Sequence, residues 1–343
     1  MPGYQPLKIA AFETGLVQER EEFILPNDAY PTLENAYVWR ERIKRKQGFD
    51  LLGRLRRIQT AQALGNLDGA GAFSGNLKII FSLGTNAEIE IGTIVVTDGT
   101  NIFTDNGLGI LVGVPGGSGT INYTTGAITI TGGVALAPLL IDYNYFPGLP
   151  VMGLRQRELN SINSEQLVAF DQKYAYIYLG GWQEFIPGTT WTGNDSDFFW
   201  STNYWVTPAP GNLKIFWVTN FSGTGGDPIR YTDGISWFNF GAGSVPLVGV
   251  INIANDFLNQ CLCLIPFRGR LVAFNTFEGQ SLATSVQYRQ RIRWAAIGNP
   301  LIVQNLPATI GPWRDDVRGK GGFLDIPTSE NIVSVGFVRD NVV

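Results

Sequence analysis

The chain contains no histidine, and this absence removes several classes of chemistry. Ser-His-Asp and Cys-His nucleophilic sites need an imidazole base, and many zinc sites use imidazole ligands. Only two cysteines are present, Cys261 and Cys263, in the apolar stretch LNQCLCLIPF. In a strand both thiols would point to the same face, so we expect buried structural cysteines without an intrachain disulfide.

Charged residues and long apolar runs are also scarce. Charged residues make up 16 % of the 343 residues and the formal net charge is −4, so the chain as a whole is not a nucleic-acid-binding polycation. No apolar run approaches the ~18 residues that a membrane-spanning helix needs, and the N-terminus lacks a signal-peptide pattern. The sequence therefore predicts a soluble or assembled protein with no membrane partner.

Glycine, in contrast, is abundant, with 42 residues. Short runs of Val, Ile, Tyr, Phe and Trp alternate with turn residues along most of the chain. β-branched and aromatic residues favour strands, and glycine favours tight turns between them. We therefore predict an all-β fold.

The first two parts of the chain differ in composition. Residues 1–64 are predicted to form an extended basic arm with a short helix over 51–64, in which several leucines share one face. Residues 65–150 are rich in Gly, Thr and Ile, with short strands separated by turns such as Thr125-Gly126. This pattern predicts a small inserted β-sandwich or barrel.

Residues 151–343 repeat a loose unit of apolar hairpins followed by an aromatic-bearing strand, around Trp182, Trp237 and Trp294. Repeated four-stranded units of this kind are typical of β-propeller blades, with a β-sandwich as the alternative. The last residues enter a new apolar strand, whose backbone groups would need a partner. We therefore expect the blades to be incomplete within this chain, which would continue in a longer polypeptide or be completed by another segment.

Few residues suggest catalysis. Asp195 with Asp197, and Asp315 with Asp316, are possible carboxylate pairs of a glycosidase, with solvated turns as the alternative. The dense tryptophans between Trp182 and Trp237 fit a sugar-stacking surface, or else a core with an interface. No residues assemble into an active site, so we predict that the protein is not an enzyme and holds no cofactor or metal.

Two basic patterns are the candidate contact sites. Arginine binds carboxylates and phosphates with two parallel hydrogen bonds, so both patterns could face another subunit or a DNA conduit, although the first could also be solvated surface. In the stretch YRQRIRWAAIGNP, a strand would place the arginines on one face and Ile292 and Trp294 on the other, with Trp294 packed inward. The candidates are Arg40, Arg42, Lys44, Arg45, Lys46, Arg54, Arg56 and Arg57 in the arm, and Arg289, Arg291 and Arg293 in that strand.

FRGRLVAFNT followed by YRQRIRWAAIGNP resembles a pattern of the tail nozzle or tail hub proteins of short-tailed bacteriophages, also called packaged-DNA stabilisation proteins. The segment AYVWRERIKRKQGFDLLGRL is similar to their opening segment. Proteins of this family have β-propeller cores. The predicted insert at 65–149 departs from the family pattern.

The resemblance implies a structural virion protein of the phage tail, assembled in the host cytoplasm. Such a protein would form an oligomeric ring, with a hexamer favoured, that extends the portal channel, retains packaged DNA and conducts it at ejection. Its partners would be further copies, the portal or adaptor and other tail proteins, with transient non-specific contact to DNA. The alternative is a tail adhesin that binds a receptor or glycan through the 65–150 insert, and a third hypothesis is a glycan-cleaving enzyme using Asp195 or Asp197.

Overall fold

The structure is a computed structural model that describes residues 51–159, 165–206, 213–223, 226–304, 310–338 and 341–342, together with four short strands before residue 51. The chain divides into two compact units, Met1–Leu52 and Gly53–Val343. In the first unit, β1 (Gly15–Leu16) pairs parallel with β2 (Ala29–Tyr30), and β3 (Ala36–Trp39) pairs antiparallel with β4 (Arg42–Arg45). The described elements are strands apart from one four-residue helix, which confirms the all-β prediction.

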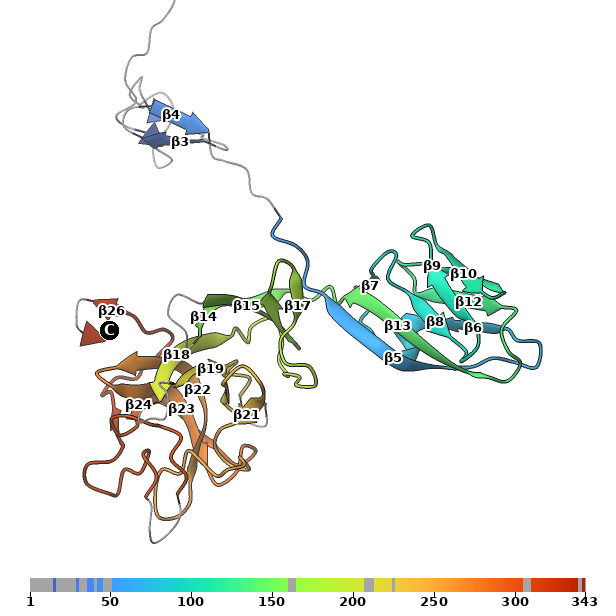
Figure 1. The fold of residues 1–343 in the computed structure, drawn as a ribbon. Helices are drawn as coiled ribbons and strands as arrows, with labels where there is room; N and C mark the ends of the chain where they lie inside the picture. Colours follow the sequence, from blue (N-terminus) through green and yellow to red (C-terminus); the bar gives the residue numbers. More distant parts are fainter. Residues whose placement is uncertain are drawn as a thin grey trace, which may run out of the picture. The chain divides into compact units, whose positions relative to one another are not determined.

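The second unit begins with a nearly closed, barrel-like antiparallel sheet, here called the barrel (Figure 1). Its strands are β5 (Arg57–Asn66), β6 (Phe73–Asn76), β7 (Glu88–Ile89), β8 (Val95–Thr97), β9 (Ile102–Asp105), β10 (Ile110–Val114), β11 (Ser118–Ile121), β12 (Ala127–Thr131) and β13 (Pro138–Phe146). They are ordered β5-β13-β8-β9-β10-β11-β12-β6, β7 pairs with β13, and the short helix α1 (Leu77–Ile80) follows β6.

The barrel core follows from the alternation of apolar and polar residues. In β12, Ile128 and Ile130 are buried while Ala127 and Thr131 are exposed. The same alternation in β9 buries Phe103, which is fully inaccessible to solvent. Because successive side chains of a strand point to opposite faces, each strand contributes every second residue to a single core.

The segment 51–64 is not a helix, so this part of the prediction was wrong. Its second half belongs to β5, which pairs antiparallel with β13 from Arg57 opposite Tyr145 to Asn66 opposite Pro138. Leu51 and Leu52 are 80 % and 50 % exposed, so they provide no buried face of the kind that stabilises helices in proteins. The sheet therefore starts at residue 57, before the predicted boundary at residue 65.

Three four-stranded antiparallel sheets follow, here called the first, second and third blades (Figure 1). The first blade contains β14 (Val151–Glu158), β15 (Glu165–Asp171), β16 (Ala175–Tyr178) and β17 (Trp182–Glu184). The second contains β18 (Trp200–Val206), β19 (Leu213–Thr219), β20 (Arg230–Thr232) and β21 (Trp237–Asn239). The third contains β22 (Phe257–Phe267), β23 (Arg270–Gly279), β24 (Val286–Trp294) and β25 (Gly322–Asp325), and the hairpin of β26 (Phe337–Val338) and β27 (Asn341–Val342) comes after it.

The blades pack on one another through buried aromatic and aliphatic side chains. The first strands of successive blades are neighbours, since β14 contacts β18 and β18 contacts β22. Phe170 of the first blade stacks on Phe216 of the second, with ring centroids 6.4 Å apart. Trp217 of the second blade shares a fully buried cluster with Leu258 and Leu271 of the third. This arrangement of consecutive four-stranded sheets is the predicted propeller-like architecture.

The tryptophans mainly serve as core residues. Trp182, Trp191 and Trp217 have at most 6 % of their surface exposed, and Trp313 is fully buried. Trp191 packs edge-on against Trp237 with ring centroids 5.1 Å apart. This favours the core interpretation of the tryptophan-rich region over an open sugar-stacking surface.

Both cysteines are free and buried, as predicted for core residues. They do not share one face, however, because Cys261 belongs to the cluster between the second and third blades and Cys263 to the cluster on the other face of the third blade. Asn275 on the neighbouring strand has a left-handed φ of 52°, and the two-residue alternation does not hold beside it. Burial raises the pKa of Cys263 to about 12.

Candidate arginine-carboxylate site on the third blade

The basic strand of the sequence is β24, and its two faces differ as predicted. Arg291 and Arg293 point to a polar side lined by carboxylates, while Ile292 belongs to an apolar cluster on the other face. Trp294 lies with Ile292 but is only half-buried, so the predicted inward packing is incomplete. Arg289 is exposed, and its Nε donates to Oε1 of Gln287 at 3.2 Å.

The arginine cluster is formed by Arg291, Arg293, Glu278, Asp315 and Asp325. Arg293 donates from Nε and Nη2 to the two oxygens of Glu278, both at 2.8 Å, and from Nη1 to Asp315 at 3.0 Å. Arg291 donates from Nε and Nη2 to Asp325 at 2.7 and 2.8 Å, and from Nη1 to Glu278 at 3.0 Å. Glu278 therefore joins both guanidinium groups, and it accepts a further bond from Thr276 Oγ1 at 2.7 Å.

The centre of the cluster is buried, and carboxylates outnumber arginines by one. The side chains of Arg293 and Glu278 are 1 % and 4 % exposed. Burial disfavours the charged form of Arg291, but hydrogen bonds to Asp325 and attraction to Glu278 outweigh it and raise the pKa of this guanidinium. The hydrogen bond from Arg291 lowers the pKa of Asp325. Two positive and three negative charges leave one net negative charge, so the cluster repels an additional anion.

A polar cavity of about 450 Å³ lies beside the cluster and is lined by Arg291, Arg293, Tyr288 and Phe323 among others. The Arg291 guanidinium lies 3.7 Å from the ring centroid of Tyr288 and 4.2 Å from that of Phe323. Both arginines already donate to carboxylates, and a phosphate would have to displace these partners. Through these ion pairs, the cluster holds β23, β24 and β25 to one another and to the loop that carries Asp315.

The arm arginines that the structure describes are also paired within the chain. Arg54 donates to Glu88 at 2.7 Å and lies 4.0 Å above the ring of Phe146, and Arg56 reaches Glu90 at 3.5 Å. These ion pairs are partly exposed and connect the residues before β5 to the barrel, and the expectation that the arginines face an acidic partner subunit or DNA stays a prediction. The side chains of Arg40, Arg42, Lys44, Arg45 and Lys46 lie outside the described residues.

Arg57 makes the most extensive contacts of the arm residues that are described. Its Nε and Nη2 donate to Glu184 of the first blade at 3.0 and 2.8 Å, and its Nη1 donates to the hydroxyl of Tyr145 at 3.1 Å. The guanidinium lies 3.8 Å from the ring centroid of Tyr174. Burial opposes the charged form, but Tyr145 and Glu184 outweigh it and raise the pKa of Arg57. This arginine therefore links β5 to the first blade.

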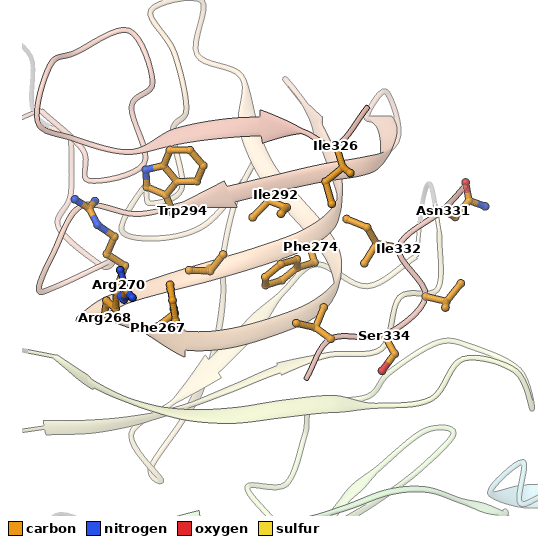
Figure 2. A pocket seen from close by; sticks show the side chains of 13 residues that line it. Phe267, Arg268, Arg270, Phe274, Ile292, Trp294, Ile326, Asn331, Ile332 and Ser334 are labelled. Atoms are coloured by element: carbon orange, nitrogen blue, oxygen red, sulfur yellow. The ribbon is translucent and has the colours of Figure 1, made fainter. Parts of the chain in front are cut away.

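The opposite side of the third blade carries an apolar cavity of about 640 Å³ (Figure 2). We call this side the apolar face and define it by Phe267, Val272, Phe274, Ile292 and Trp294. In Figure 2, Phe274 and Ile292 project from the sheet, and Ile332 lies on a segment that passes beside them.

That segment is held to the apolar face by specific contacts. The backbone N–H of Ile332 donates to the carbonyl oxygen of Arg289 at 3.1 Å, and Asn275 donates from Nδ2 to the carbonyl oxygen of Ile332 at 3.0 Å. Phe337 stacks on Phe267 with ring centroids 6.3 Å apart. The rest of the apolar face borders the cavity, and Trp294 remains only half-buried there.

The carboxylates considered for catalysis accept hydrogen bonds from other groups of the chain. Asp197 closes a turn by accepting from the backbone N–H of Asn194 at 2.9 Å, and Asp195 accepts from the side chain of Gln172. Asp315 belongs to the arginine cluster, and Asp316 accepts two hydrogen bonds from Arg314, both at 2.5 Å.

The part of the chain that the structure describes offers no candidate for a metal site or a membrane-spanning helix. Among the residues that the structure describes, no group of three or more Cys, Asp or Glu side chains is arranged to hold a metal ion. No described helix is long and apolar enough to cross a membrane.

Sequence reasoning found the arginines of the cluster but missed Glu278, its central residue. The signal was present, since Glu278 is the only carboxylate in the largely buried strand RLVAFNTFEG. Comparison of the chain with models of known families, with curated proteins and with solved structures finds no match.

Proposed function

We propose that the chain is a structural subunit of the tail of a short-tailed bacteriophage, of the nozzle or hub type. In this role it forms an oligomeric ring, favoured to be a hexamer, that extends the portal channel, retains packaged DNA and conducts it at ejection. The main support is the stack of three consecutive four-stranded sheets joined by buried aromatic clusters, which agrees with the propeller core implied by the sequence resemblance.

The use of charge in the molecule supports a structural role. Arg57, Arg291 and Arg293 are each held by buried or partly buried carboxylates, so these charged groups fix strands and loops in place. A conduit for DNA should bind the phosphate backbone only weakly, because each phosphate contact adds affinity through counterion release and slows passage. Internal neutralisation of these arginines is consistent with such a conduit.

The apolar face of the third blade fits the same proposal. The second blade is covered on both faces, by the first blade through one buried cluster and by the third through another. The third blade has the same kind of aromatic and aliphatic side chains on its far face, but Trp294 is only half-buried and a cavity remains. Burial of such a face is worth about 25 cal/mol per Å². We expect a further β-sheet to cover it in the assembled particle.

The proposal is tested in a phage whose copy of this gene carries a stop codon. Such a phage should fill its capsids and then lose the genome, so that the DNA becomes sensitive to nuclease. Mass spectrometry should detect the chain in wild-type particles, and electron microscopy should place it in the tail below the portal. Nuclease-resistant, infectious particles without the chain would contradict the proposal.

The basic arm is tested in the same system. Replacing Arg42 and Arg45 with glutamate should impair docking to a neighbouring ring without unfolding the blades. Replacing Arg318, an exposed arginine near the third blade, with glutamate is the matched control and should leave assembly unchanged. Arg57 is unsuitable for this test because its replacement would break the contact with Glu184. Glycan binding by the barrel, together with particles that retain DNA without the chain, would favour the adhesin alternative.

A further inference from the structure

The outer surface of the barrel over β8 to β12, here called the neutral face, carries no exposed charge among its described residues. Between Ile91 and Ile141 the only charged residues are Asp98 and Asp105, and they are 6 % and 7 % exposed. Asp98 accepts from the backbone and side chain of Asn101, and Asp105 accepts from other polar groups of the barrel. Soluble domains contain about 25 % charged residues on average.

The side chains of the neutral face form regular rows across neighbouring strands. In one row, Val95 pairs with Thr104, Thr104 with Val112, Val112 with Ser118, and Ser118 with Thr131. This row crosses five strands and consists of β-branched side chains and one serine. Such rows make a firm surface, because β-branched side chains have few rotamers to lose on contact.

Apolar groups of the neutral face are open to solvent. Ile102 and Val114 pair directly and are 51 % and 66 % exposed, and Val112 is 51 % exposed. Exposed apolar groups that gather on one surface indicate an interaction site.

Some hydroxyl groups of the neutral face already bond to one another. Thr120 and Thr129 are joined at 2.7 Å, and Ser118 and Thr131 at 3.2 Å. Burying hydroxyls that keep a hydrogen-bond partner costs less than burying unpaired ones. A partner could therefore cover these strands without providing a hydrogen bond for each hydroxyl.

We propose that the neutral face is the surface through which the barrel contacts a second copy of this chain. DNA or an anionic membrane would require exposed cations, which the described residues of the face do not supply. A glycan platform would require an exposed ring, whereas Phe103 is fully buried and the hydroxyl of Tyr123 donates to Asp105 at 2.7 Å. A second neutral, β-branched surface meets no repulsion here, because neither side of such a contact presents an exposed charge.

The size of the neutral face sets the expected strength of the contact. Five strands spaced about 4.8 Å apart, with about three rows roughly 7 Å apart, carry about 500 Å² per copy, and because the sheet curves around the barrel one partner covers only part of this area. Stable interfaces bury about 800 Å² per partner, so this contact is weak between isolated copies. It becomes effective where other contacts raise the local concentration of copies, as in the proposed ring. The inference rests on the proposed function only for the ring in which copies are brought together, whereas the contact itself can be measured with the purified chain.

Sedimentation equilibrium of the purified full chain at high concentration tests the proposal. Val112 lies within the long row and points to solvent, so Val112→Lys and Val112→Glu should each keep the fold. Each variant places like charges together in a self-contact and should weaken association at least ten-fold, and an equimolar mixture of the two should recover most of it. Ile235→Lys, at an 81 % exposed position of the second blade, is the matched control and should associate as the native chain does.

Other outcomes of the sedimentation experiment would contradict the proposal or assign the neutral face to a different partner. A native chain that stays monomeric at high concentration, or Val112 variants that associate as the native chain does, would overturn the proposal. Glycan binding that the Val112 variants lose, with self-association unchanged, would assign the neutral face to a different partner. Self-association through this face in a chain that is absent from phage particles would uphold the inference and contradict the proposed function.

Discussion

Replacing Glu278 with glutamine tests whether the arginine cluster holds the third blade together. Glu278 accepts hydrogen bonds from Arg291, Arg293 and Thr276 and is 4 % exposed. Glutamine offers one acceptor oxygen in place of two and turns an NH₂ group toward guanidinium donors. Removing one partner of a buried ion pair costs about 3–5 kcal/mol. Because Asp315 and Asp325 still neutralise the arginines, we expect the lower end of that range, about 3 kcal/mol.

Urea unfolding followed by tryptophan fluorescence measures the effect. All nine tryptophans lie outside the barrel strands at residues 57–146, so the signal does not report on the barrel. With a slope of about 2–3 kcal/mol per molar urea, the midpoint should fall by roughly 1 M. The control is Asp325→Asn, because Asp325 is 50 % exposed and an exposed ion pair contributes about 0–1 kcal/mol. Equal midpoints for the two variants, or a Glu278→Gln midpoint equal to that of the native chain, would refute the central role of Glu278.

Three further predictions concern packing, pH and thiols. Trp217→Ala should destabilise the blades by about 3–5 kcal/mol, whereas Trp294→Ala, at a half-buried position, should cost about 1 kcal/mol in urea unfolding of the same chain. Burial alone would raise the pKa of Asp98, but hydrogen bonds, led by those from Asn101, lower it to about 2. The ionised carboxylate therefore stabilises the barrel at pH values above its unfolded pKa of 3.8, and this stabilisation is lost as the pH falls toward 2. Asp98→Asn should therefore speed hydrogen exchange in β8 to β12 at pH 7, and the difference from the native chain should shrink near pH 2. Native Cys261 and Cys263 should resist a thiol reagent at pH 8 and react on unfolding, because burial raises both pKa values; rapid labelling of the folded chain would contradict this burial.

The fold was largely predictable because each strand carries a local signal. The burial of every second residue in β12 follows from the alternation of apolar and polar residues in the sequence. The buried aromatics around Trp217 follow from the high density of tryptophan in that part of the chain. The helix predicted over 51–64 was wrong because the leucines there have helical spacing, whereas pairing with β13 determines the structure. In that pairing Arg57 lies opposite Tyr145. Strand pairing between residues so far apart in the sequence overrides local helix propensity, and no local sequence pattern reveals it.

The candidate site was predictable only in part, for the same reason. Alternation correctly placed Arg291 and Arg293 on one face of β24 and Ile292 on the other. Whether arginines face solvent, DNA or carboxylates depends on which residues the other strands bring to them. Asp325 meets Arg291 across 34 positions of sequence, and no spacing rule connects such a pair. Arg291 and Arg293 form ion pairs within the chain because the third blade supplies its own carboxylates, while Arg289 stays exposed.

The two ends of the barrel have a genetic consequence. Arg57 at the start of β5 lies opposite Tyr145 near the end of β13, so the chain enters and leaves the barrel on adjacent antiparallel strands about 5 Å apart. A recombination event with breakpoints at these two positions would exchange the entire module while the flanking polypeptide kept its course. Such an exchange would leave the first blade undisturbed only if the incoming module kept the contact of Arg57 with Glu184.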